Sequence, residues 1–175
     1  MNQVILVNSN DEEIGHIDKM TAHQEGLMHR AFSVFILSAK GDMLLQKRAI
    51  EKYHSGGLWT NACCSHPAPG QNTLNSAQVR LLAEMGFTCT IHHAFSFSYK
   101  ASFDNGLSEN EFDHVFIGYY DGKIIPNTNE VSDFAWTSLS KIKEKIAAEP
   151  FTFTEWFKIA FPKVEEYLIL KGYTL

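Results

Sequence analysis

The chain has 175 residues, 45% of them hydrophobic and 20% charged, which is the balance of a soluble globular protein with one substantial core. Its formal net charge of -5 argues against a general nucleic-acid binder, because such proteins usually carry a basic surplus. No apolar run approaches the roughly 18 residues of a membrane span, and the N-terminus lacks the features of a signal peptide. The three cysteines, an odd number, suggest no disulfide framework and fit a reducing compartment. We therefore expect one cytoplasmic domain, residues 1–175, with no nucleic-acid and no membrane partner.

The pattern along the chain alternates between strands and helices. Short β-rich or alternating runs predict strands at residues 4–7, 31–37, 43–48, 58–60, 88–99, 111–120 and 134–136. The second and third of these are predicted to form a hairpin, and residues 121–123 predict another hairpin turn. Residues 49–71, rich in Gly and Pro, predict a long loop, and long ordered loops are often functional. With further helices predicted at 140–148 and 154–170, the second broken or kinked at Pro162, the fold class is α/β, a mixed sheet flanked by helices.

The clearest helix covers residues 73–85. Its apolar residues fall on one stripe, formed by Leu74, Ala77, Leu81, Leu82 and Met85. Asn72 or Thr73 can cap its start, and Gly86 supplies a stop. On the opposite side Ser76, Arg80 and Glu84 follow one another at a spacing of four. In an arbitrary helix, Arg80 and Glu84 would be read as a solvated ion pair.

Residues 59–67 place a thiol, Cys64, two positions before an imidazole, His66. A thiolate is a nucleophile or a proton carrier, and a neutral imidazole is the commonest protein ligand for metals. Flanking Gly and Pro residues indicate a loop, where sites are often assembled. Taken alone, the segment is equally consistent with a buried structural cysteine and a surface histidine.

Two further groups can contribute ligands. His23 and His29 are six residues apart, which is not a helical spacing, so a shared ligand would require a loop, for which Gly26 is suited. On an extended segment the side chains of Glu109 and Glu111 point to the same side, and a cation or a shared proton would relieve their repulsion. Solvated loop histidines and a polar loop are the simpler interpretations of each group alone.

Together with His66, these residues would form a set of three imidazoles and two carboxylates. Such a set suits an octahedral divalent ion, Mn²⁺, Mg²⁺ or Zn²⁺. The sequence shows no partner for the remaining histidines considered, and we expect these to be structural or exposed: His54, His92, His93 and His114. Cys89, on a predicted strand, is expected to be a small core residue.

Several short segments, in this order, resemble one enzyme family. They are Ala22-His23, residues 29–33, residues 46–49, residues 58–61, residues 64–67, residues 83–86, residues 109–111 and residues 154–156. The combination of Trp-Thr-Asn-x-x-Cys-x-His-Pro with a downstream Glu-Asn-Glu resembles type I isopentenyl-diphosphate isomerase, a metal-dependent isomerase with a Nudix-like fold. The resemblance extends from about residue 4 to residue 160, nearly the whole chain.

The resemblance implies a role for each site residue. Cys64 and Glu111 would exchange protons with opposite faces of the substrate, with Tyr99 assisting, and Cys63 would be a neighbour. The first metal would be bound by His23, His29, His66, Glu109 and Glu111. Glu84 would hold a Mg²⁺ that accompanies the diphosphate, in place of the simple ion pair. The remaining contacts to the substrate would come from Lys19, Arg48, Lys52 and Arg80 at the phosphates and from Trp156, whose π face would meet a carbocation.

The resemblance also implies the reaction and the partner. The enzyme would interconvert isopentenyl and dimethylallyl diphosphate for isoprenoid biosynthesis, with a small-molecule diphosphate as partner. Independently of the resemblance, we expect a monomer or weak homodimer.

Two other functions remain to be weighed. A Nudix-type diphosphate hydrolase needs the box Arg-Glu-x-x-Glu-Glu before x-Gly, whereas residues 79–86 retain only the last glutamate, Glu84. This departure argues against hydrolysis. A non-catalytic zinc protein would explain the Cys and His residues as structural ligands, but such sites rarely recruit two carboxylates.

Overall fold

The computed structural model describes residues 3–52, 54–103 and 106–173. Its strands are β1 (Gln3–Val7), β2 (Glu13–Asp18), β3 (His29–Leu37), β4 (Met43–Arg48), β5 (Trp59–Thr60), β6 (Cys63–Ser65), β7 (Ile91–Ser102), β8 (Ser108–Tyr119) and β9 (Val131–Thr137). Its helices are α1 (Lys19–Glu25), α2 (Thr73–Met85), α3 (Leu139–Ala148), the 3-10 helix η1 (Pro150–Thr152) and α4 (Glu155–Leu170). The predicted class, a mixed sheet with helices on it, is confirmed.

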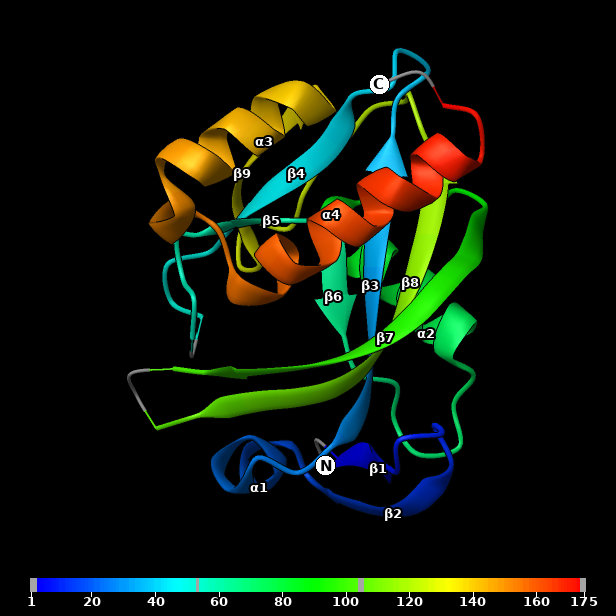
Figure 1. The fold of residues 1–175 in the computed structure, drawn as a ribbon, viewed down its shortest axis with the longest axis vertical. Helices are drawn as coiled ribbons and strands as arrows, with labels where there is room; N and C mark the ends of the chain where they lie inside the picture. Colours follow the sequence, from blue (N-terminus) through cyan, green and yellow to red (C-terminus); the bar gives the residue numbers. More distant parts are fainter. Residues whose placement is uncertain (1–2, 53, 104–105, 174–175) are drawn as a thin grey trace.

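Strand β3 is the centre of the sheet. Along its length it pairs in parallel with β8, from His29 opposite Glu111 to Leu37 opposite Tyr119. On its other edge it pairs antiparallel with β6, where Ser33 faces Cys64. Strand β7 forms a long antiparallel ribbon with β8, which crosses the lower half of the view in Figure 1. The strands that carry the Cys and Glu motifs therefore lie on either side of β3.

Helices cover both faces of this sheet. Alternate residues of β3 point to opposite faces: Phe35 and Leu37 pack with α3 and α4, whereas Val34 and Ile36 pack with α2. In Figure 1, α3 and α4 lie on the near side of the sheet and α2 lies behind it. Each buried side chain of this size contributes about 1.5–3 kcal/mol, so a register slip that exchanged the two faces would be costly.

Helix α2 agrees with its predicted bounds. The side chain of Asn72 accepts a hydrogen bond from the backbone N–H of Asn75, and Gly86 ends the helix in the left-handed conformation with φ 74°. A Cβ at Gly86 would also lie 2.0 Å from the carbonyl oxygen of Ile125, so both conformation and space require glycine. Leu82 is an exception to the predicted buried stripe, because it is exposed.

The hairpin predicted for β3 and β4 is confirmed at its closing pair, Leu37 opposite Met43, but the strands do not pair beyond it because β6 and β8 occupy the edges of β3. Two other predictions are corrected. The turn at residues 121–123 does not return the chain onto β8; β9 pairs with β4 instead. Cys89 precedes β7 rather than lying in it, and it is half-buried against the α2 core.

Near the N-terminus two elements were not predicted, and the C-terminal helix is continuous where a break or kink was predicted. The segment that contains His23 was predicted as a loop, but it forms α1, whose end is capped by Gly26. Strand β2, which pairs with β1, was not predicted either. Helix α4 continues through Pro162, which lies on its exposed side, so the predicted break is absent.

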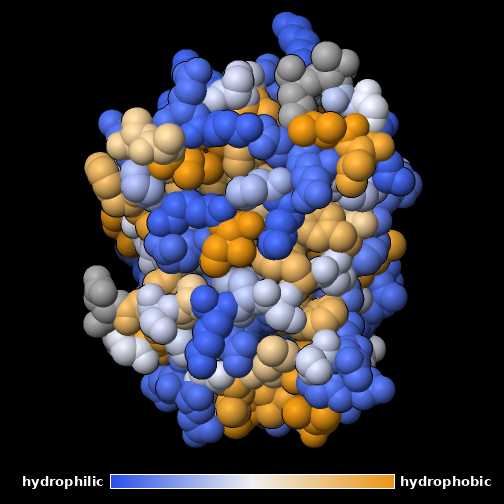
Figure 2. All heavy atoms as spheres, viewed as in Figure 1, coloured by the Kyte–Doolittle hydropathy of each residue, from blue (hydrophilic) through white to orange (hydrophobic). Residues whose placement is uncertain are grey.

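The outer surface mixes polar and apolar residues. On the face seen in Figure 2, the apolar side chains lie in separate groups between hydrophilic ones. Among the described helices, none has the length and apolar character to cross a membrane.

Candidate active site

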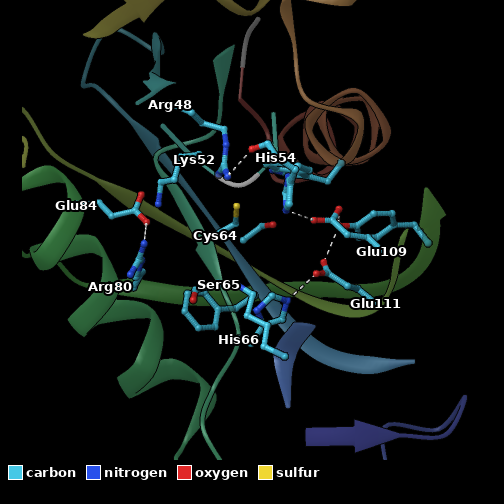
Figure 3. A pocket seen from close by; sticks show the side chains of 15 residues that line it. Arg48, Lys52, His54, Cys64, Ser65, His66, Arg80, Glu84, Glu109 and Glu111 are labelled. Carbon is cyan, nitrogen blue, oxygen red and sulfur yellow. Dashed lines mark hydrogen bonds and ion pairs between the residues drawn. The ribbon is translucent and has the colours of Figure 1, made fainter. Parts of the chain in front are cut away.

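A cavity of about 200 Å³ opens on the α4 face of the sheet, over β3 and residues of β6, β7 and β8. Figure 3 shows the side chains of Arg48, Cys64, His66, Glu84 and Glu111 arranged around it. Its wall contains Lys19, Phe32, Ser33, Arg48, Lys52, His54, Cys64, Ser65, His66, Arg80, Glu84, Tyr99, Glu109, Glu111 and Trp156. Every residue predicted for the site therefore lines this cavity except His23 and His29, which lie buried next to it.

The two adjacent cysteines point to opposite sides of β6. Cys63 is fully buried in the core under α2, whereas Cys64 lines the cavity and packs against the α4 core. Burial raises the pKa of the Cys64 thiol, and this effect exceeds the opposing influence of Arg48. The thiol in the cavity is therefore neutral and carries a proton.

The three predicted histidine ligands converge. His23 donates from Nδ1 to the carbonyl oxygen of Lys19 at 2.7 Å, and His29 donates from Nδ1 to that of Leu27 at 2.8 Å. Both bonds fix the tautomer in which Nε2 carries a lone pair, as in metal-binding histidines. Nε2 of His66 lies 3.2 Å from Nε2 of His29 and 2.7 Å from Oε1 of Glu111.

These four residues form a group that can hold a metal ion. The ligand atoms of His23, His29, His66 and Glu111 all lie within 4.8 Å of one another. Burial lowers the pKa of His66 to about 3, more than its hydrogen bond to Glu111 raises it, so the imidazole is neutral. Neutral imidazoles and a carboxylate are the donor set that a divalent cation requires. The donors present therefore fit the metal that the sequence predicted.

The two carboxylates share one hydroxyl. Glu109 and Glu111 alternate along β8 and point to the same side, as predicted. The Tyr99 hydroxyl lies 2.8 Å from Oε2 of Glu109 and 2.6 Å from Oε2 of Glu111. Burial and the charge of Glu111 raise the pKa of Glu109 well above its usual value. Burial also opposes ionisation of Glu111, but the neighbouring imidazoles of His29 and His66 outweigh it and hold the pKa of Glu111 well below its usual value.

At the other end of the cavity, cationic side chains gather around Glu84. Arg80 donates from Nε to Oε1 of Glu84 at 2.5 Å, so the ion pair expected from the helix spacing is present. Gln46 donates to Oε2 of the same carboxylate at 2.7 Å. Lys52 and Arg80 both contact Glu130, the latter at 2.9 Å. This end of the cavity offers several cationic donors and one carboxylate oriented by two partners.

Two further cations complete the wall. The guanidinium of Arg48 lies over the Trp156 ring, with its Cζ 5.1 Å from the ring centroid. One face of the indole is therefore occupied by Arg48. Burial lowers the pKa of Lys19, more than the nearby Glu111 and Cys64 raise it.

Two histidines for which the sequence showed no partner have partners in the structure. His54 lies in the cavity wall, buried beside Glu109, with its Nε2 3.6 Å from Oε1 of that carboxylate. His114 lies outside the site and contacts Asp11 through Nε2 at 2.9 Å and Ser96 through Nδ1 at 3.1 Å. His92 is exposed, as expected.

Sequence reasoning also missed Asp113 and Ser33. Ser33 donates to Oδ2 of Asp113 at 2.8 Å, directly beneath the site. Burial and the charge of Glu111 raise the pKa of Asp113 to about 8, despite the hydrogen bond from Ser33. The signal was available, because Asp113 continues the alternation of Glu109 and Glu111 along the strand.

Comparison with known proteins agrees with the site. The family model for the NUDIX domain matches residues 27–157. Isopentenyl-diphosphate Delta-isomerase 2 of Aromatoleum aromaticum is 43% identical over 170 residues, covering 97% of this chain and 90% of that protein. Isopentenyl-diphosphate Delta-isomerase 2 of Photorhabdus laumondii is 46% identical over 169 residues, covering 94% and 96%.

Solved structures share the fold at lower identity. The DR0079 protein of Deinococcus radiodurans superposes with a TM-score of 0.70 at 18% identity, covering 84% of this chain and 90% of that one. A MutT protein of Methanosarcina mazei gives a TM-score of 0.66 at 19% identity, covering 83% and 96%. These two likenesses show the fold alone. With the family model and the relatives above, the chain belongs to the Nudix family and, within it, to the isopentenyl-diphosphate Delta-isomerases.

Proposed function

We propose that this isomerase interconverts isopentenyl and dimethylallyl diphosphate through two groups in the cavity, Cys64 and Glu111. The reaction adds a proton to the terminal methylene of isopentenyl diphosphate and removes another from C2. The observation that carries the proposal is the placement of the Cys64 thiol and the Glu111 carboxylate in one cavity wall. The raised pKa of the thiol and the lowered pKa of the carboxylate support it. The two residues reach the cavity from β6 and β8, on opposite edges of β3, so they can act on the substrate from different sides.

The first metal would be held by His23, His29, His66, Glu111 and Glu109. When bound, a Mn²⁺, Mg²⁺ or Zn²⁺ ion would supply positive charge that makes the protonated form of Glu111 more acidic. The support is the convergence of three imidazoles and a carboxylate. In two of the imidazoles, His23 and His29, a hydrogen bond from Nδ1 to a backbone carbonyl leaves the lone pair on Nε2. Glu109, next to this group on β8, completes the predicted set after a rotation of its side chain.

The residues of this chain then hold and move protons at defined atoms. Sγ of Cys64 carries one proton, and Oε2 of Glu111 lies within hydrogen-bonding distance of the Tyr99 hydroxyl, which can pass a proton to it or accept one. A carbocation-like state between the two groups would gain about 2 kcal/mol or more from the Trp156 ring if water is excluded. Burial of Trp156 and Tyr99 supports this exclusion.

The diphosphate would bind where Lys19, Arg48, Lys52 and Arg80 line the cavity. Guanidinium and ammonium groups suit a diphosphate because it needs several cationic donors. Glu84 would bind the accompanying Mg²⁺ through its carboxylate, which Gln46 and Arg80 already orient. Binding would require Arg80 and Lys52 to exchange part of their contact with Glu130 for the phosphates.

The site argues against diphosphate hydrolysis. Activation of water in a Nudix hydrolase depends on several glutamates of one helix, whereas α2 contributes only Glu84 to the cavity. The other carboxylates of the cavity, Glu109 and Glu111, come from β8 and contact Tyr99 and the histidines.

The test is turnover in D₂O, followed by NMR of the substrate and product. We expect deuterium to enter the substrate carbons, no inorganic phosphate to be released, and exhaustive chelation to abolish turnover. Cys64→Ala and Glu111→Gln should each lower kcat by about 100-fold or more. Near-normal turnover by either variant would show that the two-sided proton transfer is wrong, and phosphate release would favour the hydrolase.

For the cell, we propose a cytoplasmic enzyme whose partner is the small diphosphate itself, acting as a monomer or weak homodimer. All three cysteines are free, which supports a reducing compartment.

A further inference from the structure

His54 occupies a position that the predicted metal set does not use. Its side chain is 4% exposed, and its backbone carbonyl accepts a hydrogen bond from Nη2 of Arg48 at 3.3 Å. Its ligand atom lies within 4.8 Å of those of His23 and Glu109, which together form a second cluster. This cluster shares His23 with the first one, so His54 adjoins the predicted metal site through two of its members.

Aromatic packing fixes the orientation of the imidazole. Phe103 stacks on it with ring centroids 5.0 Å apart and an interplanar angle of 14°, and Trp156 meets it edge-on at 5.7 Å and 84°. Nδ1 lies 3.2 Å from the hydroxyl oxygen of Ser55. If this hydroxyl donates to Nδ1, the remaining ring proton is on Nε2, which is the atom that faces Glu109.

The two carboxylates of the site differ in how they are held. Glu111 contacts Nε2 of His66 at 2.7 Å, and Nε2 of His29 lies 3.6 Å from it; both histidines are themselves predicted ligands. Glu109 contacts Tyr99 and His54, and its distance of 3.6 Å from Nε2 of His54 is slightly longer than a hydrogen bond. A hydrogen bond would form if either side chain rotated toward the other. Figure 3 shows His54 and Glu109 facing each other across it.

We propose that His54 is a positioning residue for Glu109: its Nε2–H would donate to Oε1 of Glu109 and, with Tyr99 at Oε2, would orient this carboxylate for the predicted metal set. Partners of this kind orient a metal-binding carboxylate, and their loss typically lowers metal affinity by about 10–100-fold. The inference rests on the proposed function only for the existence of the metal site. It predicts that metal affinity depends on the donor at residue 54, not on its aromatic ring.

The experiment measures Mn²⁺ binding to the full-length, chelator-stripped protein by calorimetry. His54→Phe keeps the ring that packs on Phe103 and Trp156 but removes the donor, and we expect Mn²⁺ affinity to fall by about 10-fold or more. His54→Gln places an N–H near the position of Nε2, and it should restore most of the affinity. His114→Phe is the matched control, because His114 also pairs with a carboxylate but lies outside the site, and it should bind Mn²⁺ like the wild type.

Two outcomes would overturn the proposal. Wild-type affinity in His54→Phe would show that the histidine only packs. If His54→Gln is as weak as His54→Phe, and the visible spectrum of the Co²⁺-loaded protein shows a lower coordination number in both, His54 is a direct ligand instead. Urea unfolding of each variant without metal separates these results from a failure to fold. The proposed function fails separately, if the metal-stripped wild-type enzyme still turns over.

Discussion

Replacing Tyr99 by phenylalanine tests whether its hydroxyl only holds the two carboxylates or also passes a proton. The hydroxyl offers one proton to two acceptors, Glu109 at 2.8 Å and Glu111 at 2.6 Å. Phenylalanine keeps the packing of the ring, including its stacking with Phe97. The substitution therefore removes one shared hydrogen bond and opens almost no cavity.

The size of the effect follows from this geometry. A hydrogen bond to a charged group contributes about 1.5–3 kcal/mol, and because Tyr99 has a single proton the loss counts once. We therefore expect metal-free Tyr99→Phe to lose about 2 kcal/mol of unfolding free energy. If the same free energy is lost from the orientation of the metal ligands, metal affinity should fall by a factor of about 30. If the hydroxyl also transfers a proton, kcat at saturating metal should fall by about 100-fold or more, and this is the result we expect.

Two measurements separate these roles. Urea unfolding of the chelated protein reports the lost hydrogen bond, and kcat at saturating Mn²⁺ and Mg²⁺ reports the proton transfer. Tyr119→Phe is the control, because Tyr119 lies on β8 outside the cavity and its hydroxyl contacts neither carboxylate. A normal kcat once metal is saturating would refute the transfer role, and an unchanged unfolding free energy would refute the hydrogen-bond reasoning itself.

Three further outcomes follow from the site. Cys63→Ala should lower the free energy of unfolding by about 1–2 kcal/mol and leave kcat unchanged, whereas Cys64→Ala should lower kcat and change the free energy of unfolding little. Urea unfolding and turnover of the two variants test this difference. Glu84→Gln should raise the Mg²⁺ concentration needed for half-maximal kcat/KM, and an unchanged Mg²⁺ titration would contradict the role of Glu84. Burial lowers the pKa of His54 and His66 from 6.5 to about 3 in the folded state, so the unfolded chain binds more protons below pH 6.5. The free energy of unfolding of the chelated protein should therefore be highest above pH 6.5 and should fall on acidification by up to about 1.4 kcal/mol per pH unit for each histidine. An unfolding free energy that stays constant between pH 7.5 and 5.5, measured with urea, would contradict these pKa values.

Local patterns in the sequence were sufficient for part of this structure. Alternation along a strand placed Glu109 and Glu111 on one side, and the caps and apolar spacing placed α2. For Cys63 and Cys64 the sequence predicted a loop, whereas they lie on the short strand β6, so local patterns did not tell which cysteine faces the cavity. The family motif supplied that choice, and the position of Cys64 in the cavity wall agrees with it.

The errors arose where distant segments decide the outcome. A turn at residues 121–123 predicts a hairpin, but β9 finds its partner in β4, more than 80 residues earlier in the chain. His54 lies in a segment rich in Gly and without periodicity, and its position depends on contacts with Phe103, Glu109 and Trp156. None of these contacts leaves a signal near residue 54.

The two ends of the cavity are built with different rigidity, and this difference fits their proposed tasks. Cys64 and Glu111 lie on strands that pair with opposite edges of β3, in registers set by Ser33 and His29. A slip of one residue in either pairing would turn its side chain to the α2 face and remove it from the cavity. Proton transfer to carbon tolerates little displacement of the reacting groups, so strand positions suit them.

Lys52, by contrast, lies in the loop after β4, and Arg80 is a long side chain on the half-exposed side of α2. A diphosphate presents many equivalent oxygens, so cations that can adjust are sufficient to bind it. We therefore expect substitutions that disturb β3 pairing to lower kcat, and substitutions in the loop after β4 to raise KM.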